Sequence, residues 1–137
     1  MAEKIELEIV TPEQLLFSGK VEEVVVPGSE GYLGILPGHA PLLSELQIGV
    51  ISYRQDSQET KVFCNRGFVE VLPDRVSILA EAAEFPDQIN VEQARAHQMQ
   101  AEQLLRSDDP DTDYAKALLD LREAQIRLDL AEQSTAS

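Results

Sequence analysis

The stretch GFVEVLPDRVSILAEAA, residues 67–83, decides the fold class because it contains two short segments that favour strands around one turn. Its three valines and its isoleucine are residues that strands prefer, whereas Pro73-Asp74-Arg75 in the middle is typical of a turn. The stretch therefore predicts two consecutive strands joined by a tight connection.

The same pattern continues toward the N-terminus. In KIELEIV, residues 4–10, Ile5, Leu7 and Ile9 alternate with glutamates, which predicts a strand with one buried face. Further strand-like segments are KVEEVVVPG (20–28), GVISYRQ (49–55) and ETKVFC (59–64), with Gln-Asp-Ser-Gln and Asn65-Arg66-Gly67 as separators. Several short strands at near-regular spacing predict an antiparallel sandwich or barrel.

The composition changes near residue 87. All seven glycines and six of the seven prolines precede that position, and Pro110 is the one proline after it. Such a change marks the passage from a turn-rich region to a helical one. We therefore expect a fold of the β plus α class, with an N-terminal domain at residues 1–86 and a helical region at residues 87–137.

The second region predicts two helices, at about residues 91–106 and 112–133. Asn90 is a suitable N-cap with Gln93 three residues later, and Asp111 or Thr112 can cap the second helix. The short break at 107–111 predicts an antiparallel helical hairpin, and Ala94, Ala101, Ala117 and Ala124 would let its backbones approach closely.

The second helix has more apolar surface than one neighbouring helix can cover. One stripe contains Tyr114, Ala117, Leu118, Leu121, Ala124, Leu128 and Ala131; a weaker one contains Ala115, Leu119, Ile126 and Leu130. The second stripe must meet either the β-domain or another protein. Attachment at one end would also let the hairpin alternate between two positions.

Charge and composition exclude several classes of function. The net charge is −14, which argues against nucleic acid and against binding to anionic lipid. No apolar run is long enough to cross a membrane, and the N-terminus MAEKIELEIV does not resemble a signal peptide, so we expect a cytosolic location. Cys64 is the only cysteine and lies among apolar residues, which predicts a buried thiol.

Residues 30–46, EGYLGILPGHAPLLSEL, form the most distinctive segment before the helices. His39 lies there without a suitable catalytic companion, and the sequence has no zinc-ligand spacing, no phosphate-loop ending and no nucleophile elbow. We therefore predict no catalytic residue and no metal site. The glycines and prolines instead predict a rigidly shaped loop, with positive φ at the glycines.

Two runs, VVVPGSEGYLGILPGHAPLLSELQIGVI and NRGFVEVLPDRVSILAEAAE, resemble the β-domain of the epsilon subunit of F-type ATP synthase. The most specific motif is Gly-x-x-Gly-x-x-x-Gly-His-x-Pro-Leu, from Gly31 to Leu42. VEQARA at 91–96 and DTDYAKALLDLREAQIRL extend the resemblance over nearly the whole chain. It implies an N-terminal β-sandwich followed by a two-helix hairpin.

The resemblance implies a non-catalytic rotor subunit of a proton-translocating complex. The sandwich would bind the gamma subunit and the c-ring, through a face that includes Glu30, Gly31, Tyr32, Gly38, His39, Ala40, Pro41 and Leu42. The hairpin would either fold against the sandwich or extend along gamma to the alpha/beta catalytic head and inhibit ATP hydrolysis. In the extended state Lys116, Arg122 and Arg127 would meet an acidic segment of a catalytic subunit.

Some members of that family bind ATP as a regulatory ligand through a motif that opens the first helix. The matching residues here are Val91, Glu92, Arg95 and Ala96, with Arg127 in the second helix. Glu92 stands where those relatives have aspartate, Glu102 stands where they have arginine, and Glu123 occupies another basic position. Glu92 keeps an acceptor but moves its carboxylate, and Glu102 and Glu123 would repel a triphosphate, so we expect weak ATP binding or none, and no other cofactor.

Two other interpretations remain open at this stage. The chain could be a freestanding β-sandwich adaptor with its helical tail folded against it, or a small hydrolase that uses His39. The resemblance favours the rotor subunit and implies a peripheral location at the cytoplasmic side of a bacterial plasma membrane, with no insertion into lipid.

Overall fold

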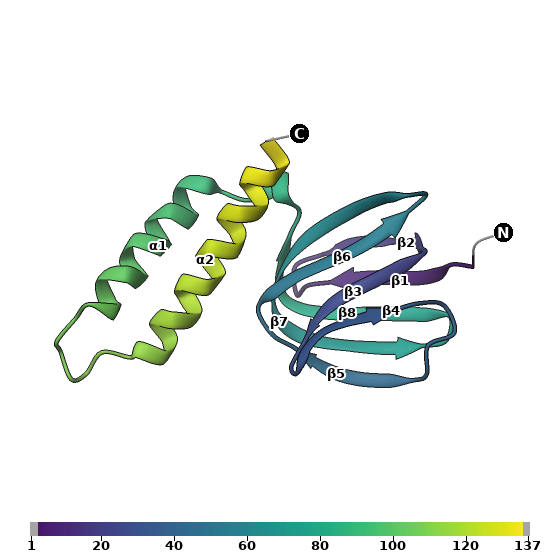
Figure 1. Cartoon of the computed structure of the whole chain (residues 1–137), viewed down its shortest axis with the longest axis horizontal. Helices are drawn as coiled ribbons and strands as arrows, with labels where there is room; N and C mark the ends of the chain where they lie inside the picture. The colour runs from purple at the N-terminus through teal and green to yellow at the C-terminus, as the bar shows by residue number, and fades with distance from the viewer. Residues whose placement is uncertain (1–2, 136–137) are drawn as a thin grey trace. The chain divides into compact units, whose positions relative to one another are not determined.

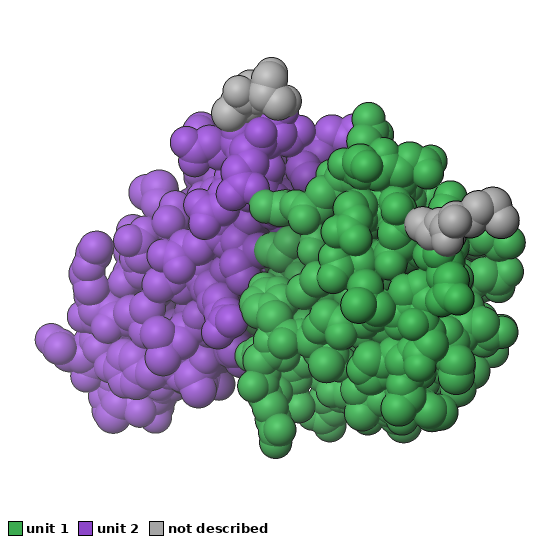
Figure 2. All heavy atoms as spheres, turned by 45° about the vertical axis from the view of Figure 1, so that its right-hand side comes forward, with its two compact units in different colours: residues 1–84 green, residues 85–137 purple. Residues whose placement is uncertain are grey.

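The computed structural model describes residues 3–135, with the side chain of residue 135 left out. The chain divides into two compact units, residues 1–84 and 85–137, which Figure 2 shows in separate colours. The division falls two residues before the expected one. The reason is that a 3₁₀ helix, η1 (Pro86–Gln88), contacts the second helix of the helical unit.

The first unit is a β-sandwich (Figure 1). Its strands are β1 (Ile5–Val10), β2 (Leu15–Val21), β3 (Glu23–Gly28), β4 (Gly31–Ile35), β5 (Leu42–Leu46), β6 (Gly49–Gln55), β7 (Gln58–Leu72) and β8 (Arg75–Glu84). They are hydrogen-bonded in the order β2-β1-β8-β7-β5-β3-β4, with β6 between β3 and β7. The predicted fold class is confirmed. Among the described strand pairs β1 and β8 are parallel, whereas the other pairs are antiparallel.

The core of the sandwich follows the alternation predicted from the sequence. Ile5, Leu7 and Ile9 of β1 are fully buried, whereas Glu6 and Glu8 between them are exposed. Other large buried side chains include Val21, Val24, Val26, Ile35, Ile51, Val62, Phe63, Val69 and Ile78. Burial of these apolar side chains is the main favourable contribution to the stability of this unit.

Asn65-Arg66-Gly67 does not separate two strands, contrary to the sequence-based prediction. β7 continues through these residues, and β8 pairs with it on both sides of them. The first part of β7 pairs with β6 and the later part with β5, so the strand changes partner here. Arg66 (φ 43°) and Gly67 (φ 154°) have positive φ, which bends the strand without ending it.

The sequence-based prediction also misplaced other strands. The segment 20–28 belongs to the end of β2 and to β3, with Glu22 between them. β2, β4 and β5 were not predicted as strands, because their sequences contain glycine or lack a clear alternation of apolar and polar residues. These three strands form because they pair with β1, β3 and β7, although their own sequences have only a weak preference for strand structure.

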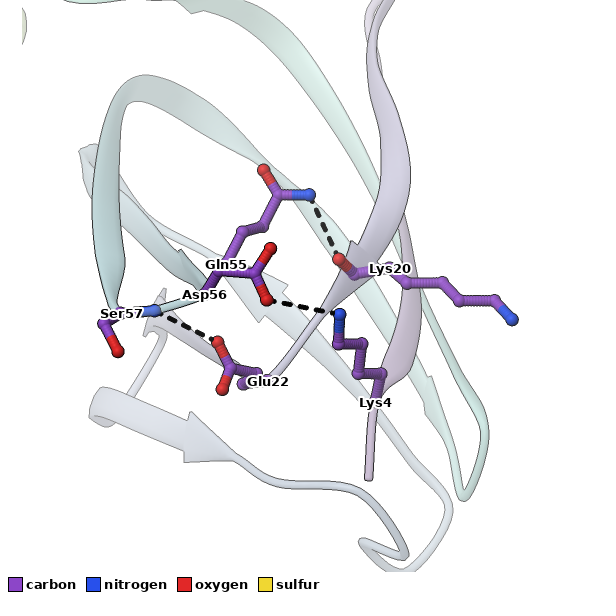
Figure 3. A network of polar contacts seen from close by, with 6 residues as sticks. All are labelled: Lys4, Lys20, Glu22, Gln55, Asp56 and Ser57. Carbon is purple, nitrogen blue, oxygen red and sulfur yellow. Dashed lines mark hydrogen bonds and ion pairs between the residues drawn. The ribbon is translucent and has the colours of Figure 1, made fainter. Parts of the chain in front are cut away.

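A network of polar contacts joins the β6–β7 turn to the corner between β2 and β3 (Figure 3). The turn residues Asp56 (φ 47°) and Ser57 (φ 71°) have the left-handed conformation of a two-residue hairpin turn. Gln55 donates to the carbonyl of Lys20, and the Ser57 N–H donates to Glu22. Lys4 forms an ion pair of 3.5 Å with Asp56. These contacts hold the turn against the neighbouring strands.

The second unit contains η1 and the helices α1 (Val91–Leu105) and α2 (Tyr114–Thr135), which lie side by side and are joined by the turn at 106–113 (Figure 1). The Asn90 side chain caps α1 by accepting from the Gln93 N–H at 3.0 Å, as predicted. For α2 the predicted cap was wrong. Asp113, rather than Asp111 or Thr112, accepts from the Lys116 N–H, which moves the start of the helix to Tyr114.

Five alanines are buried along α1 and α2, which contact one another. Ala94 and Ala101 of α1 are buried, and so are Ala117, Ala124 and Ala131 of α2. We call these five residues the alanine seam. In each helix they recur every seven residues, which places them on one side and allows close packing of the two backbones. Neither helix among residues 3–135 has the length and apolar character needed to cross a membrane.

Candidate functional site

The segment 30–42, predicted as one partner-facing loop, forms two separate turns. Glu30 belongs to the β3–β4 turn, whereas Gly38, His39, Ala40 and Pro41 belong to the connection between β4 and β5. The five residues of β4 separate them, which corresponds to about 17 Å along a strand. The eight predicted residues therefore do not form one contiguous loop.

The β3–β4 turn is held in a defined shape. Gly28 pairs with Gly31 across the turn, and the Ser29 N–H donates to Glu45 on β5. The hydroxyl of Tyr32 accepts a 3.1 Å hydrogen bond from the Val50 N–H, although much of the Tyr32 side chain is exposed. A shallow hollow of about 280 Å³ lies beside the turn and is lined by Gly28, Ser29, Glu30, Gly31, Tyr32, Leu33, Leu42 and Ser44.

The connection between β4 and β5 is also fixed by backbone contacts. The Gly38 N–H donates to Pro73 in the β7–β8 turn at 2.8 Å, and the His39 N–H donates to Leu36. Nδ1 of His39 donates to the carbonyl of its neighbour Ala40 at 2.7 Å. Gly31 (φ 129°) and Gly38 (φ 85°) have positive φ, as predicted, whereas Gly34 of the same segment does not. Both turns therefore have a backbone conformation that hydrogen bonds fix, and each has exposed side chains.

A band of apolar side chains, which was not predicted from the sequence, crosses the outer face of the sheet. Phe68 of β7 lies opposite Leu79 of β8, Leu79 lies opposite Val10 of β1, and Val10 lies opposite Leu15 of β2. Leu43 of β5 is a diagonal neighbour of Phe68. We call Leu43, Phe68, Leu79, Val10 and Leu15 the apolar band.

Four of the five residues of the apolar band are unusually exposed for their type, whereas Val10 is half-buried. Phe68 is 51% exposed, Leu79 is 56%, Leu15 is 57% and Leu43 is 70%. A contiguous apolar patch on a folded domain marks an interaction surface more often than a scattered exposed residue does. The alternation of apolar and polar residues in β7 and β8 does not reveal this patch, because the outward positions of the two strands also include Glu70 and Ser77.

The three basic residues assigned to partner binding in α2 have different surroundings. Lys116 forms an ion pair of 2.8 Å with Asp120, and this hydrogen bond, with the charge of Asp120, raises the pKa of the Lys116 ammonium. Arg122 is exposed. Arg127 is buried, and its guanidinium donates to the side-chain carbonyl of Gln93 on α1 at 3.4 Å.

The five residues expected around a nucleotide do not all line the same one of two hollows in the hairpin. Val91 and Arg95 line one hollow of the hairpin, about 650 Å³, together with Gln98, Met99, Leu128, Ala131 and Glu132. Arg127 lines a different hollow of about 300 Å³, together with His97, Lys116, Asp120 and Glu123. The lining of these two hollows includes neither Glu92 nor Ala96. Acidic side chains accompany the basic ones in both hollows, Glu132 in the first and Asp120 and Glu123 in the second.

Cys64 lies in the core of the sandwich, as predicted. Burial raises the pKa of its thiol from 9.0 to about 12. Within the described part of the chain, no three His, Cys, Asp or Glu side chains gather as a metal site would require.

Comparison with known proteins gives a consistent result. Residues 4–86 match the family model described as ATP synthase, Delta/Epsilon chain, beta-sandwich domain. A protein of Koribacter versatilis described as ATP synthase epsilon chain is 50% identical over 111 residues, which cover 81% of this chain and 78% of that protein. A protein of Syntrophobacter fumaroxidans with the same description is 44% identical over 134 residues, which cover 98% of this chain and all of that protein.

Two solved assemblies contain chains with a similar fold. A chain of the Euglena gracilis mitochondrial ATP synthase (OSCP/F1/c-ring) aligns with a TM-score of 0.71 at 19% identity, over 97% of this chain and 80% of its own length. A chain of the Tetrahymena thermophila mitochondrial ATP synthase (central stalk/c-ring) aligns with a TM-score of 0.59 at 17% identity, over 97% of both chains.

Proposed function

This chain belongs to the delta/epsilon chain family of ATP synthase, and we propose that it is a non-catalytic subunit of the central stalk in a proton-translocating complex. The sandwich binds the gamma subunit and the c-ring, and the helical unit regulates ATP hydrolysis. The apolar band is the observation that supports this proposal most strongly, since it offers an unpartnered surface of the kind that a stable interface covers.

The apolar band is suited to the gamma subunit. Its side chains come from β1, β2, β5, β7 and β8, so the hydrogen-bonded sheet fixes their relative positions. A rigid surface loses little conformational freedom when a partner binds, which favours affinity. The two fixed turns, which contain Glu30 and His39, supply polar contacts to gamma and to the c-ring.

The helical unit also has apolar residues available for a partner. Leu118 and Leu119 of α2 are exposed, and Tyr114 is exposed near the start of the same helix. When the hairpin extends, these residues contact gamma and the alpha/beta head and inhibit hydrolysis. Arg122, which is exposed, then approaches an acidic segment of a catalytic subunit.

The net negative charge of the helical unit weakens its attraction to an acidic segment of a catalytic subunit. From residue 87 on it contains eleven acidic and five basic side chains. Lys116 is already paired with Asp120, so only part of its charge is available to a partner. We infer that this hairpin inhibits less strongly than a basic one would. The subunit itself is peripheral and lies at the cytoplasmic side of a bacterial plasma membrane.

Removal of residues 88–137 from the assembled complex tests the regulatory part of the proposal. We expect faster ATP hydrolysis with unchanged assembly, because the sandwich keeps its own core and the apolar band. A matched variant, Leu118→Ser/Leu119→Ser, keeps the hairpin and removes two of its exposed apolar contacts; we expect a smaller increase. Unchanged hydrolysis after the truncation would contradict an inhibitory hairpin.

A further inference from the structure

We propose that the partner surface that covers the apolar band carries lysine or arginine side chains at its edge, placed to meet Glu8, Glu45 and Glu70. We call these three glutamates the acidic rim. The inference rests on the proposed binding of the sandwich to gamma, and it adds the chemistry of the surface that binds. It follows from the register of the strands and from the surroundings of the three carboxylates.

The register of the sheet places the acidic rim directly beside the apolar band. Glu8 precedes Val10 by two residues on β1, so both side chains belong to the outer face. Glu70 follows Phe68 by two residues on β7, and Glu45 of β5 lies opposite Phe68. Two residues along a strand span about 7 Å, and paired residues are about 5 Å apart. Each carboxylate therefore lies within reach of a partner that covers the band.

Two members of the acidic rim stand in one row across the sheet. Glu8 of β1 lies opposite Ser77 of β8, and Ser77 lies opposite Glu70 of β7. Because one strand separates the two glutamates, their backbones are about 10 Å apart. The residue between them has no charge, so the row gives one side of the band a negative edge.

The carboxylates of the acidic rim are exposed and have no partner within the part of the chain that the structure describes. None of the ion pairs or side-chain hydrogen bonds among residues 3–135 involves a carboxylate oxygen of the three glutamates. Glu81 differs from them. It also lies two residues from a band member, Leu79, but it forms an ion pair of 3.7 Å with Arg66. We therefore do not include Glu81 in the rim.

The basic residues of the same face lie farther from the band. Lys20 of β2 and Arg75 of β8 both lie opposite Glu6 of β1. Arg75 precedes Leu79 by four residues, which corresponds to about 13 Å along a strand. The acidic row that contains Glu8 lies between these cations and the band. The charge next to the band is therefore negative.

This charge selects the kind of surface that can cover the band. An apolar contact removes water from neighbouring charges, which costs free energy unless a charge of opposite sign meets them. A second copy of this chain would bring the same three carboxylates to the interface and has a net charge of −14. Lysine and arginine at the edge of an apolar surface would instead pair with the rim. Charge complementarity thus favours a partner with a basic edge over self-association.

The kinetics of binding to the gamma subunit test the inference with the full-length chain. The variant Glu8→Gln/Glu70→Gln removes two charges of the rim and keeps the size of the side chains. The matched control is Asp108→Asn/Asp111→Asn, which removes two exposed charges from the turn between α1 and α2. Both variants change the net charge by the same amount, so a difference between them reports the position of the charges.

We expect the association rate constant of the rim variant to fall about three- to tenfold at low salt, because oppositely charged surfaces accelerate encounter. Added salt should slow the unchanged chain more than the rim variant, since it screens the attraction. The control should change by less than about twofold. Equal or faster association of the rim variant would overturn the inference.

A second comparison separates this inference from the proposed function. If Phe68→Ser/Leu79→Ser weakens binding to gamma but Glu8→Gln/Glu70→Gln does not, the band binds gamma without a basic edge, and the inference alone is wrong. If the unchanged chain does not bind gamma, the proposed function fails and the inference fails with it. Sedimentation should show that the free chain is monomeric. A dimer that Phe68→Ser/Leu79→Ser abolishes would mean that a second copy covers the band, which also contradicts the inference.

Discussion

Gly67 of β7 lies so close to Leu79 of β8 that a Cβ atom at residue 67 would stand 2.0 Å from the Leu79 carbonyl oxygen. This contact occurs where β7 changes its partner from β6 to β5. The bend also places Phe68, the next residue, on the outer face opposite Leu79. The geometry of one glycine thus positions part of the apolar band.

Replacement of Gly67 by alanine should destabilise the sandwich strongly. Both the positive φ of 154° and the short distance to a backbone atom oppose a side chain there. We expect a loss of at least about 2 kcal/mol in the free energy of unfolding, measured by denaturant titration. Gly34→Ala is the matched control, since a Cβ at that position meets no atom within 4 Å. An equal effect of both substitutions would contradict this explanation of the bend.

Enlargement of the alanine seam should separate the helices locally. Ala124→Leu adds three carbon atoms at a residue that is 1% exposed, and we expect a destabilisation of about 1–3 kcal/mol in the helical unit. Hydrogen exchange of the α1 and α2 amides measures it without requiring global unfolding. The control is Ala96→Leu, at an exposed position of α1, for which we expect little change. Equal protection in the two variants would argue against close packing at the seam.

The buried thiol of Cys64 should make stability fall at high pH. Its pKa is about 12 in the folded chain and about 9 when exposed, so the unfolded state loses its proton first. The contribution of the protonated Cys64 thiol to the free energy of unfolding is complete below about pH 9 and decreases as the pH rises toward 12. Cys64→Ala should lose this part of the pH dependence. At pH 8 the native thiol should resist alkylation and react only after denaturation; rapid labelling of the native chain would disagree with its burial.

ATP should bind weakly or not at all to the isolated chain. Val91 and Arg95 line one hollow of the hairpin, whereas Arg127 lines another together with Asp120 and Glu123. Calorimetric titration should show no saturation at micromolar ATP. Glu123→Arg should increase affinity, because it replaces a repulsive carboxylate with a cation that can bind phosphate. Micromolar binding by the unchanged chain would overturn this expectation.

The parts of the fold that were predictable have strong local patterns. The alternation of isoleucine and leucine with glutamate defines β1, and the loss of glycine near residue 87 defines the helical region. β4 and β5 were missed because GYLGI and LLSEL lack an alternating pattern and are formed by pairing with distant strands. Local preference does not determine such strands.

The candidate site was predictable only in part. The glycines and prolines from Gly31 to Leu42 correctly predicted turns of fixed conformation. The sequence of this motif did not predict that β4 lies within it and separates the two turns. The apolar band depends on the register of four strand pairs, so its members are spread from Val10 to Leu79 in the sequence. Arg127 was predicted to face a partner, yet its burial against Gln93 follows from the packing of two helices.

The most direct test of the central claim is the affinity of this chain for a gamma subunit, measured by calorimetry with the variant Phe68→Ser/Leu79→Ser. Both residues are about half exposed, so the sandwich should stay folded while the interface loses apolar area. We expect the dissociation constant to rise by about 30-fold or more, equivalent to about 2 kcal/mol. Met99→Ser, which removes an exposed apolar side chain from the hairpin, should leave it unchanged. An unchanged dissociation constant for the double variant would contradict the claim that the apolar band binds the rotor.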